Sequence, residues 1–152
     1  MNKLKIKFTK VPHEGVAFDV TPRYGTAGSA GCDLVAAIAE PLALAPGERA
    51  ALPTGIRVHI GEPSTVGLVC ARSGLALRHG ITLPNGVGVI DSDYTGELLV
   101  ALTNLSEAPY TINPGDRIAQ LLFMPVERAE FKEVASLEET ARGSGGFGST
   151  GK

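Results

Sequence analysis

Aromatic residues are scarce in this chain, and tryptophan is absent. Only 5% of the 152 residues are aromatic. No apolar run approaches the roughly 18 residues that a membrane span needs. Near the N-terminus, lysines alternate with Leu4, Ile6 and Phe8, so the apolar centre of a signal peptide does not form. We therefore expect no membrane segment and a cytoplasmic location.

Cysteine is also rare. The two cysteines, Cys32 and Cys70, fit no metal-ligand spacing and stand in apolar stretches. One disulfide between them is the alternative, but two buried thiols in a reducing cytoplasm are the favoured interpretation.

The chain lacks a strong charge of either sign. With 14 basic and 16 acidic residues, its net charge is −2. No overall positive field attracts nucleic acid or an anionic membrane, so direct nucleic-acid binding is not expected. A polyanionic ligand would have to be bound by local positive charge. The length suits a single domain.

Glycine and proline, in contrast, are frequent, at 19 and 10 residues. They separate short apolar runs and leave little room for the long elements of a helical bundle. The pattern predicts an all-β protein, a jelly-roll-like sandwich or barrel, with a β-rich domain over residues 1–135. The expected strands are residues 3–8, 33–38, 42–44, 49–52, 55–60, 66–71, 87–90, 97–103, 109–112, 116–124 and 126–134.

Two segments depart from this pattern. Residues 73–80 predict one short helix, with Ser73 as N-cap and Gly80 at the end. Residues 136–152 lose apolar residues and end in a glycine-rich stretch, which predicts a flexible C-terminal arm.

The arm carries side chains suited to a nucleotide. An inert linker is the plain interpretation, but Arg142, Ser149 and Thr150 can donate to phosphate oxygens, as can glycine N–H groups such as that of Gly148. Phe147, between two glycines, can stack on a base. The sharper hypothesis is an arm that closes over a nucleotide.

Arg72-Ser73-Gly74 forms a second candidate anion site, where a strand ends and the short helix begins. Free backbone N–H groups, a guanidinium and a hydroxyl meet there. Taken alone, the segment is better explained as a capped helix. Together with the arm, it becomes half of a phosphate clamp.

A glycine-rich hairpin over residues 85–96 is the third feature. Its backbone donors and acceptors can read the edge of a pyrimidine. Asp91 follows the apolar pair Val89-Ile90, so partial burial would hold its carboxylate in one orientation. The plain alternatives are a turn-capping aspartate and, for Tyr94, a core position instead of the wall of a sugar pocket.

These segments resemble the homotrimeric deoxyuridine triphosphatases (dUTPases), whose five motifs are present in order. The motifs correspond to residues 30–36, 67–76, 85–99, 115–123 and 142–151. One departure is Ala71, where the family usually has proline. The resemblance implies a jelly-roll fold, a trimer with shared active sites, and Mg²⁺-dependent hydrolysis of dUTP to dUMP and pyrophosphate. That reaction limits uracil in DNA and supplies dUMP for thymidylate synthesis.

The resemblance also implies a role for each motif residue. Asp91 would activate the water that attacks the α-phosphorus, and Asp33 would support Asp91 or a neighbouring arginine. The residues expected at the phosphates are Arg72, Ser73, Gly74 and Gln120. Uracil would be contacted by Asn85, the backbone of Val89 and Ile90, and Leu99, and the deoxyribose would pack on Tyr94. The arm would contribute Arg142, Phe147, Gly148, Ser149 and Thr150. Mg²⁺ would be held by substrate phosphates and water, because no octahedral cluster of acidic residues exists in the sequence.

Two rivals stay open. The deoxycytidine triphosphate deaminases look similar, but they carry a glutamate where this chain has Ala101, so the proton shuttle for deamination is missing. A non-enzymatic trimeric nucleotide-binding module is the other, although such a protein would be expected to have lost Asp91 or the arm.

Overall fold

The computed structural model describes residues 4–146. Its elements, in chain order, are β1 (Lys7–Lys10), β2 (Arg23–Tyr24), β3 (Cys32–Val35), β4 (Leu42–Leu44), β5 (Arg49–His59), β6 (Thr65–Cys70), α1 (Ser73–His79), β7 (Ile81–Thr82), β8 (Val87–Ile90), β9 (Glu97–Asn104), β10 (Tyr110–Ile112) and β11 (Arg117–Pro125). The chain is thus mostly β with one short helix, as the spacing of its glycines and prolines predicts.

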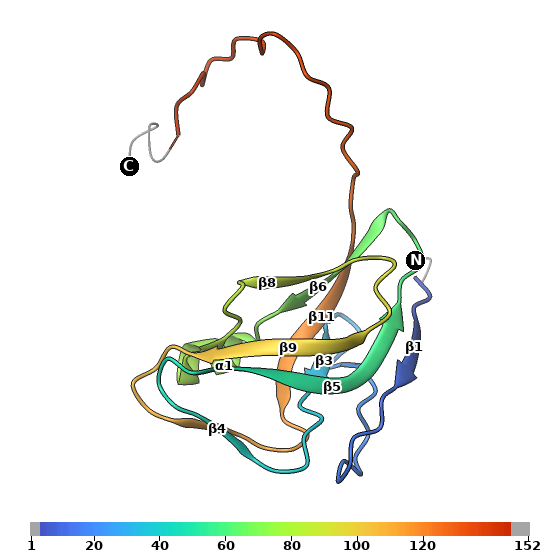
Figure 1. Cartoon of the computed structure of the whole chain (residues 1–152), viewed down its shortest axis with the longest axis vertical. Helices are drawn as coiled ribbons and strands as arrows, with labels where there is room; N and C mark the ends of the chain where they lie inside the picture. The colour runs from blue at the N-terminus through green and yellow to red at the C-terminus, as the bar shows by residue number, and fades with distance from the viewer. Residues whose placement is uncertain (1–3, 147–152) are drawn as a thin grey trace.

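Two sheets form the body of the molecule (Figure 1). One has the strand order β1-β5-β9-β7 and the other β2-β3-β11-β6-β8, and a separate pair joins β10 to β4. Side chains from the two larger sheets fill one core, which includes Leu34, Leu102 and Leu121, each at most 1% exposed. Because every strand pair is antiparallel, short turns suffice to connect many of them. The fold is a β-sandwich of the jelly-roll kind.

Most expected strands are confirmed, and the differences have local causes. The runs 49–52 and 55–60 join into the single strand β5, whose pairing with β9 shifts register between Pro53 and Arg57. The N-terminal strand covers Lys7–Lys10 instead of residues 3–8, because only these residues pair with β5. The two-residue strands β2 and β7 were not expected.

The expected strand over residues 126–134 is wrong. Within the described residues, the chain after β11 leaves the sandwich and crosses open space without joining a sheet (Figure 1). Its apolar side chains are exposed, Phe131 at 96% and Leu137 at 87%. A strand needs a neighbour to pair with, and the single chain offers none at this place.

The predicted helix is confirmed, but its cap differs. Arg72 is the N-cap residue, with extended backbone, and Ser73 is the first helical residue, with no side-chain cap hydrogen bond. Gly80 ends the helix as expected, in the left-handed region at φ 66°. The Ser73 hydroxyl is therefore not used to cap the helix. No helix among residues 4–146 has the length and apolar character to cross a membrane.

Both cysteines are free thiols, Cys32 buried and Cys70 half-buried. Burial, the largest cause, raises the pKa of the Cys32 thiol. A thiol held neutral in this way is a poor nucleophile and metal ligand.

Candidate active site

Arg72 lies where β6 ends, and an acidic residue of β3 holds its side chain in place. Arg72 Nε donates to Asp33 Oδ1 over 3.1 Å, and Arg117 donates from Nη1 to Asp33 Oδ2 over 3.2 Å. Arg72 Nη1 also donates to the carbonyl of Arg117 over 3.3 Å. Asp33 therefore contacts two arginines and not Asp91, and the pair of guanidinium groups concentrates positive charge beside the start of α1.

The Gln120 side chain also holds the segment that contains Arg72. Its side-chain amide donates to the Ala71 carbonyl over 3.1 Å. The close approach of Gln120 depends on Gly31, because a Cβ at Gly31 would lie 2.7 Å from Gln120 Oε1. Gln120 thus positions the backbone just before Arg72, and a direct contact with phosphate stays a prediction.

Ser73 and Gly74, which follow Arg72, are both exposed. A Cβ placed on Gly74 would meet no atom within 4 Å. Together with the uncommitted Ser73 hydroxyl, this leaves open space at the Arg72 side of the helix, as a phosphate-binding turn requires.

The loop over residues 91–96 leads from β8 in one sheet to β9 in the other. Asp91, at its start, is exposed, so the expected partial burial of this residue is wrong for the single chain. Within the described residues its carboxylate accepts no hydrogen bond. Its carbonyl accepts from the Tyr94 N–H over 3.1 Å, which closes a turn. The carboxylate is thus free to meet a ligand.

Tyr94 is not a core residue. Its ring is 42% exposed and lies across Gly96, where a Cβ would come within 2.6 Å of Tyr94 Cζ. The Tyr94 hydroxyl donates to the Glu97 carbonyl over 2.9 Å. The ring is therefore a flat, half-exposed surface held in one place, close in sequence to Asp91.

The residues expected to read uracil lie along β8 and β9. Because β8 is the edge strand of its sheet, one side of its backbone at Val89 and Ile90 has no strand neighbour in the described structure. Asn85 is exposed in the turn before β8. Leu99 points outward from β9 and is 57% exposed.

These features do not converge within one chain. β6 and β8 run antiparallel, with Cys70 opposite Val87 and Gly67 opposite Ile90. Arg72 therefore lies beyond one end of the strand pair and Asp91 beyond the other, as Figure 1 shows for α1 and the loop after β8. At ~3.3 Å per residue, the two are on the order of 20 Å apart along the strands.

Residues 136–146, the described part of the arm, lie away from both ends (Figure 1). Arg142 is exposed, in a short turn where its carbonyl accepts from the Gly145 N–H over 3.1 Å. The predicted contacts of Phe147, Gly148, Ser149 and Thr150 lie outside the described residues.

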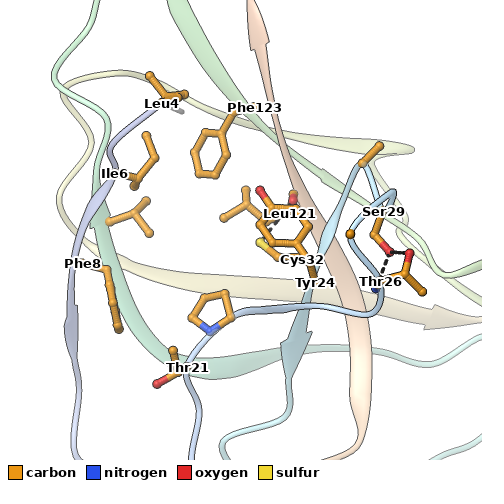
Figure 2. A pocket seen from close by; sticks show the side chains of 14 residues that line it. Leu4, Ile6, Phe8, Thr21, Tyr24, Thr26, Ser29, Cys32, Leu121 and Phe123 are labelled. Carbon is orange, nitrogen blue, oxygen red and sulfur yellow. Dashed lines mark hydrogen bonds between the residues drawn. The ribbon is translucent and has the colours of Figure 1, made fainter. Parts of the chain in front are cut away.

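One pocket of the molecule is lined by none of the expected site residues. It is an apolar groove of about 850 Å³ between the N-terminal segment and the β2–β3 region. Figure 2 shows Leu4, Ile6 and Phe8 on one side, facing Tyr24 and Phe123 on the other. Predominantly apolar walls without a cationic side chain do not suit a triphosphate.

Some contacts were not foreseen in the sequence. Asp116, next to Arg117, stabilises the turn before β11, because its Oδ2 accepts from the Asn113 N–H over 2.8 Å. That Arg117 shares Asp33 with Arg72 was missed, as was a contact between His13 and Glu97. No short-range pattern indicates contacts between residues so far apart in sequence.

The architecture and the two ends of the β6–β8 pair define a β-sandwich protein with a candidate anion-binding turn and a separate loop carrying a free carboxylate. Comparison with known proteins makes this class specific. The dUTPase family model matches residues 19–151, and the chain belongs to the dUTPase family.

Named relatives agree. The chain is 52% identical over 134 residues to the deoxyuridine 5'-triphosphate nucleotidohydrolase of Paraburkholderia xenovorans, which covers 88% of this chain and 90% of that protein. It is 47% identical to the enzyme of the same name from an Enterobacter species over 152 residues, 100% of this chain and 99% of the other.

Solved structures agree on the fold. The dUTPase of Staphylococcus bacteriophage 80alpha with dUpNHpp matches at a TM-score of 0.84 and 28% identity, over 99% of this chain and 100% of that chain. A mutant dUTPase from phage phi11 of S. aureus, with a structural Mg(II) ion, matches at 0.75 and 25% identity, over 89% and 99% of the two chains.

Proposed function

We propose that this protein is a dUTP diphosphatase, which hydrolyses dUTP to dUMP and pyrophosphate. Asp91 takes a proton from a water molecule, whose oxygen attacks the α-phosphorus. The bond from that phosphorus to the oxygen bridging to the β-phosphate breaks, and pyrophosphate leaves with the electron pair. A positioned general base of this kind contributes roughly 10²- to 10⁴-fold in rate.

The observation that carries the proposal is the loop over residues 91–96. It presents a carboxylate that has no hydrogen-bond partner among residues 4–146, close to an aromatic ring that two contacts hold in place, the Gly96 backbone and the Glu97 carbonyl. A sugar packed on Tyr94 would bring the α-phosphate toward Asp91. A sugar packed on the ring in this way would have little room for a 2′-hydroxyl, which would favour a deoxynucleotide. The names of the relatives support dUTP as that nucleotide.

The second half of the site is the charged end at Arg72 and Arg117. A triphosphate brings about four negative charges, and the net charge of the chain is −2, so local cations have to bind it. Asp33 prevents the two guanidinium groups from moving apart. Arg72, Ser73 and Gly74 would bind phosphate oxygens there, and charge developing on the leaving pyrophosphate would be stabilised.

The separation of the two ends supports a site shared between subunits. Arg72 and Asp91 of one chain are too far apart to contact one nucleotide phosphate chain together. If Asp91 of one subunit faces Arg72 of another, both contact the same substrate. A homotrimer with three such sites, each closed by an arm carrying Arg142 and Phe147, satisfies this requirement.

The segment after β11 provides a second argument for a trimer. Residues 126–139 expose apolar side chains and contain five glutamates against one arginine and one lysine. The groove of Figure 2 is mostly apolar, with Leu4, Ile6 and Phe8 of the N-terminal segment on one side. Exposed apolar side chains on the segment and apolar walls in the groove favour docking of the segment from a neighbouring subunit in the groove.

Mg²⁺ is proposed as the cofactor. Among residues 4–146 no group of three or more histidine, cysteine or acidic residues could hold a metal ion, and both oxygens of Asp33 are committed to arginines. The ion would therefore be held by the phosphate oxygens of the substrate and by water. When bound, it would neutralise charge on the triphosphate. A cytoplasmic location is proposed with the same function.

Pyrophosphate release from dUTP, dTTP, dCTP and UTP, each with and without Mg²⁺, tests the function. Rapid release from dUTP alone, lost on chelation of Mg²⁺, is expected. Release of ammonia from dCTP would support the deaminase alternative, against which stands Ala101 of β9, paired with Ala51 of β5, where the deaminases carry a glutamate. Tight dUTP binding without turnover would support the non-enzymatic module.

A further inference from the structure

Glu97, the first residue of β9, has a side chain that binds the neighbouring strand. β5 changes register against β9 between Pro53 and Arg57. Gly55, at φ 70° in this irregular stretch, donates its N–H to Glu97 Oε1 over 2.9 Å. The glutamate thus provides an acceptor to a backbone group that the shift of register removes from the regular ladder.

A second contact reaches the same carboxylate oxygen from the N-terminal segment. His13 Nε2 lies 2.7 Å from Glu97 Oε1, and the side chains are 30% and 17% exposed. The Val11 N–H donates to the Gly55 carbonyl over 2.7 Å, which attaches the same segment to β5. The start of β9 is therefore held from two directions by one side chain.

The backbone of Glu97 also supports the Tyr94 side chain. The Tyr94 hydroxyl donates to the Glu97 carbonyl over 2.9 Å, and the ring lies on the backbone of Gly96. The two groups that support the ring, the Glu97 carbonyl and the Gly96 backbone, therefore belong to Glu97 or to the residue before it. A change in the Glu97 side chain is therefore transmitted to the ring, although the carboxylate itself faces away, toward Gly55 and His13.

We propose that Glu97, assisted by His13, is a positioning residue that sets the sugar selectivity of the site by fixing Tyr94. The inference rests on the proposed function, in which the deoxyribose packs on that ring. It assigns to Glu97 a role at a distance from the nucleotide, through Tyr94.

The test compares kcat/KM for dUTP and UTP in Glu97→Ala, Glu97→Gln and His13→Ala. In Glu97→Ala the preference for dUTP over UTP is expected to fall ~10-fold, equivalent to ~1.4 kcal/mol of discrimination. Glu97→Gln keeps an acceptor for the Gly55 N–H and should restore most of the preference. Glu48→Ala is the matched control, because its carboxylate accepts the Ala45 N–H over 2.7 Å in a distant turn.

A double-mutant cycle separates positioning from general loss of structure. If Glu97 acts through Tyr94, removing the carboxylate has no further effect on the dUTP preference in a Tyr94→Ala background. Additive effects would overturn the inference. If Glu97→Ala does not fold, His13→Ala decides: a reduced preference supports the proposal, and an unchanged one contradicts it.

A measurement without substrate distinguishes failure of this inference from failure of the proposed function. The protein is labelled with fluorotyrosine, and the ¹⁹F resonance of Tyr94 is assigned by its loss in Tyr94→Phe. That resonance should shift in Glu97→Ala and His13→Ala and stay in place in Glu48→Ala. If the resonance shifts but the parent protein does not hydrolyse dUTP, the positioning of Tyr94 by Glu97 is supported and the proposed function is refuted. If the resonance does not shift and the parent hydrolyses dUTP, the positioning is refuted and the function is supported.

Discussion

Tyr94 lies across Gly96 so closely that no other residue fits at position 96. A Cβ there would be 2.6 Å from Tyr94 Cζ and 3.0 Å from Cε2, distances that only displacement of the ring can relieve. Glycine at this position is thus required by a neighbouring side chain, independently of any turn.

Gly96→Ala should therefore displace the Tyr94 ring. We expect a loss of stability of about 1–3 kcal/mol, as for other overpacked sites, and a lower kcat/KM for dUTP. Denaturant unfolding and pyrophosphate release measure the two effects. Gly28→Ala is the control, since a Cβ at Gly28 would meet nothing within 4 Å. Equal behaviour of the two variants would contradict this account of Gly96.

The free carboxylate of Asp91 leads to a prediction about catalysis. Asp91→Asn keeps the size of the side chain but cannot accept the proton, so kcat should fall roughly 10²-fold or more. Affinity for dUTP should change little, because Arg72, Ser73 and Gly74, and not Asp91, are proposed to bind the phosphates. Single-turnover rates and equilibrium binding separate the two quantities. Asp93→Asn, two residues away and also exposed, is the control, and near-normal turnover in Asp91→Asn would remove Asp91 from the role of base.

Asp33 bridges two cations, and its removal should weaken phosphate binding. In Asp33→Asn the Arg72 side chain loses a charged partner at 3.1 Å, so its guanidinium becomes mobile. We expect a KM for dUTP raised several-fold and weaker inhibition by pyrophosphate. Asp19→Asn is the control, because Asp19 also pairs with two cations, Lys10 and Arg23, neither of which is an expected site residue. An unchanged KM would show that Arg72 needs no fixed position.

The Asp19 cluster itself predicts a dependence of stability on pH. Hydrogen bonds from Lys10, the largest cause, and from Thr21 hold the pKa of the Asp19 carboxyl well below its ordinary value of 3.8. A carboxyl with a lowered pKa in the folded state stabilises the fold above the unfolded-state pKa and loses this contribution as the pH falls. The melting temperature of Asp19→Asn should therefore be below that of the parent at pH 6, and the difference should shrink below about pH 4. High salt should reduce it too, because the group is exposed.

The parts that the sequence predicts well are those set by neighbouring residues. β4 and β8 begin and end where the apolar runs do, and Gly80 ends α1 as its freedom at positive φ requires. The cap at the other end was mistaken, because Arg72 has the extended backbone of an N-cap and the preference of serine for this position is only statistical.

The parts that could not be predicted depend on distant residues. His13 and Glu97 are 84 positions apart, so no periodicity brings them together. Asp33 and Arg72 are 39 positions apart, and a contact of Asp33 with an arginine was expected only as one of two alternatives, from the family resemblance. The error at residues 126–134 has the opposite origin. The apolar residues of this segment suggested a strand, but the single chain provides no partner there within the described residues, which is the reason to look for one in another subunit.

Two truncations of the C-terminal arm separate its proposed roles. Removing residues 142–152 deletes the groups proposed to close over the nucleotide and leaves the segment proposed to dock on a neighbour. This shorter arm should abolish turnover and preserve the trimer. Removing residues 126–152 also deletes the exposed Phe131 and Leu137, and should convert the protein to smaller species.

Sedimentation velocity and pyrophosphate release, applied to both truncated proteins, provide the comparison. A variant in the groove tests docking independently. Phe8→Glu adds a negative charge to the apolar wall of the groove, opposite the glutamates of the docking segment, and should weaken the trimer of the full-length chain. Thr9→Glu is the matched control, because Thr9 is also exposed on β1 and does not line the groove. Hydrolysis of dUTP by the shorter-arm protein at the parent rate would refute closure by the arm, and an intact trimer after removal of residues 126–152 would refute docking.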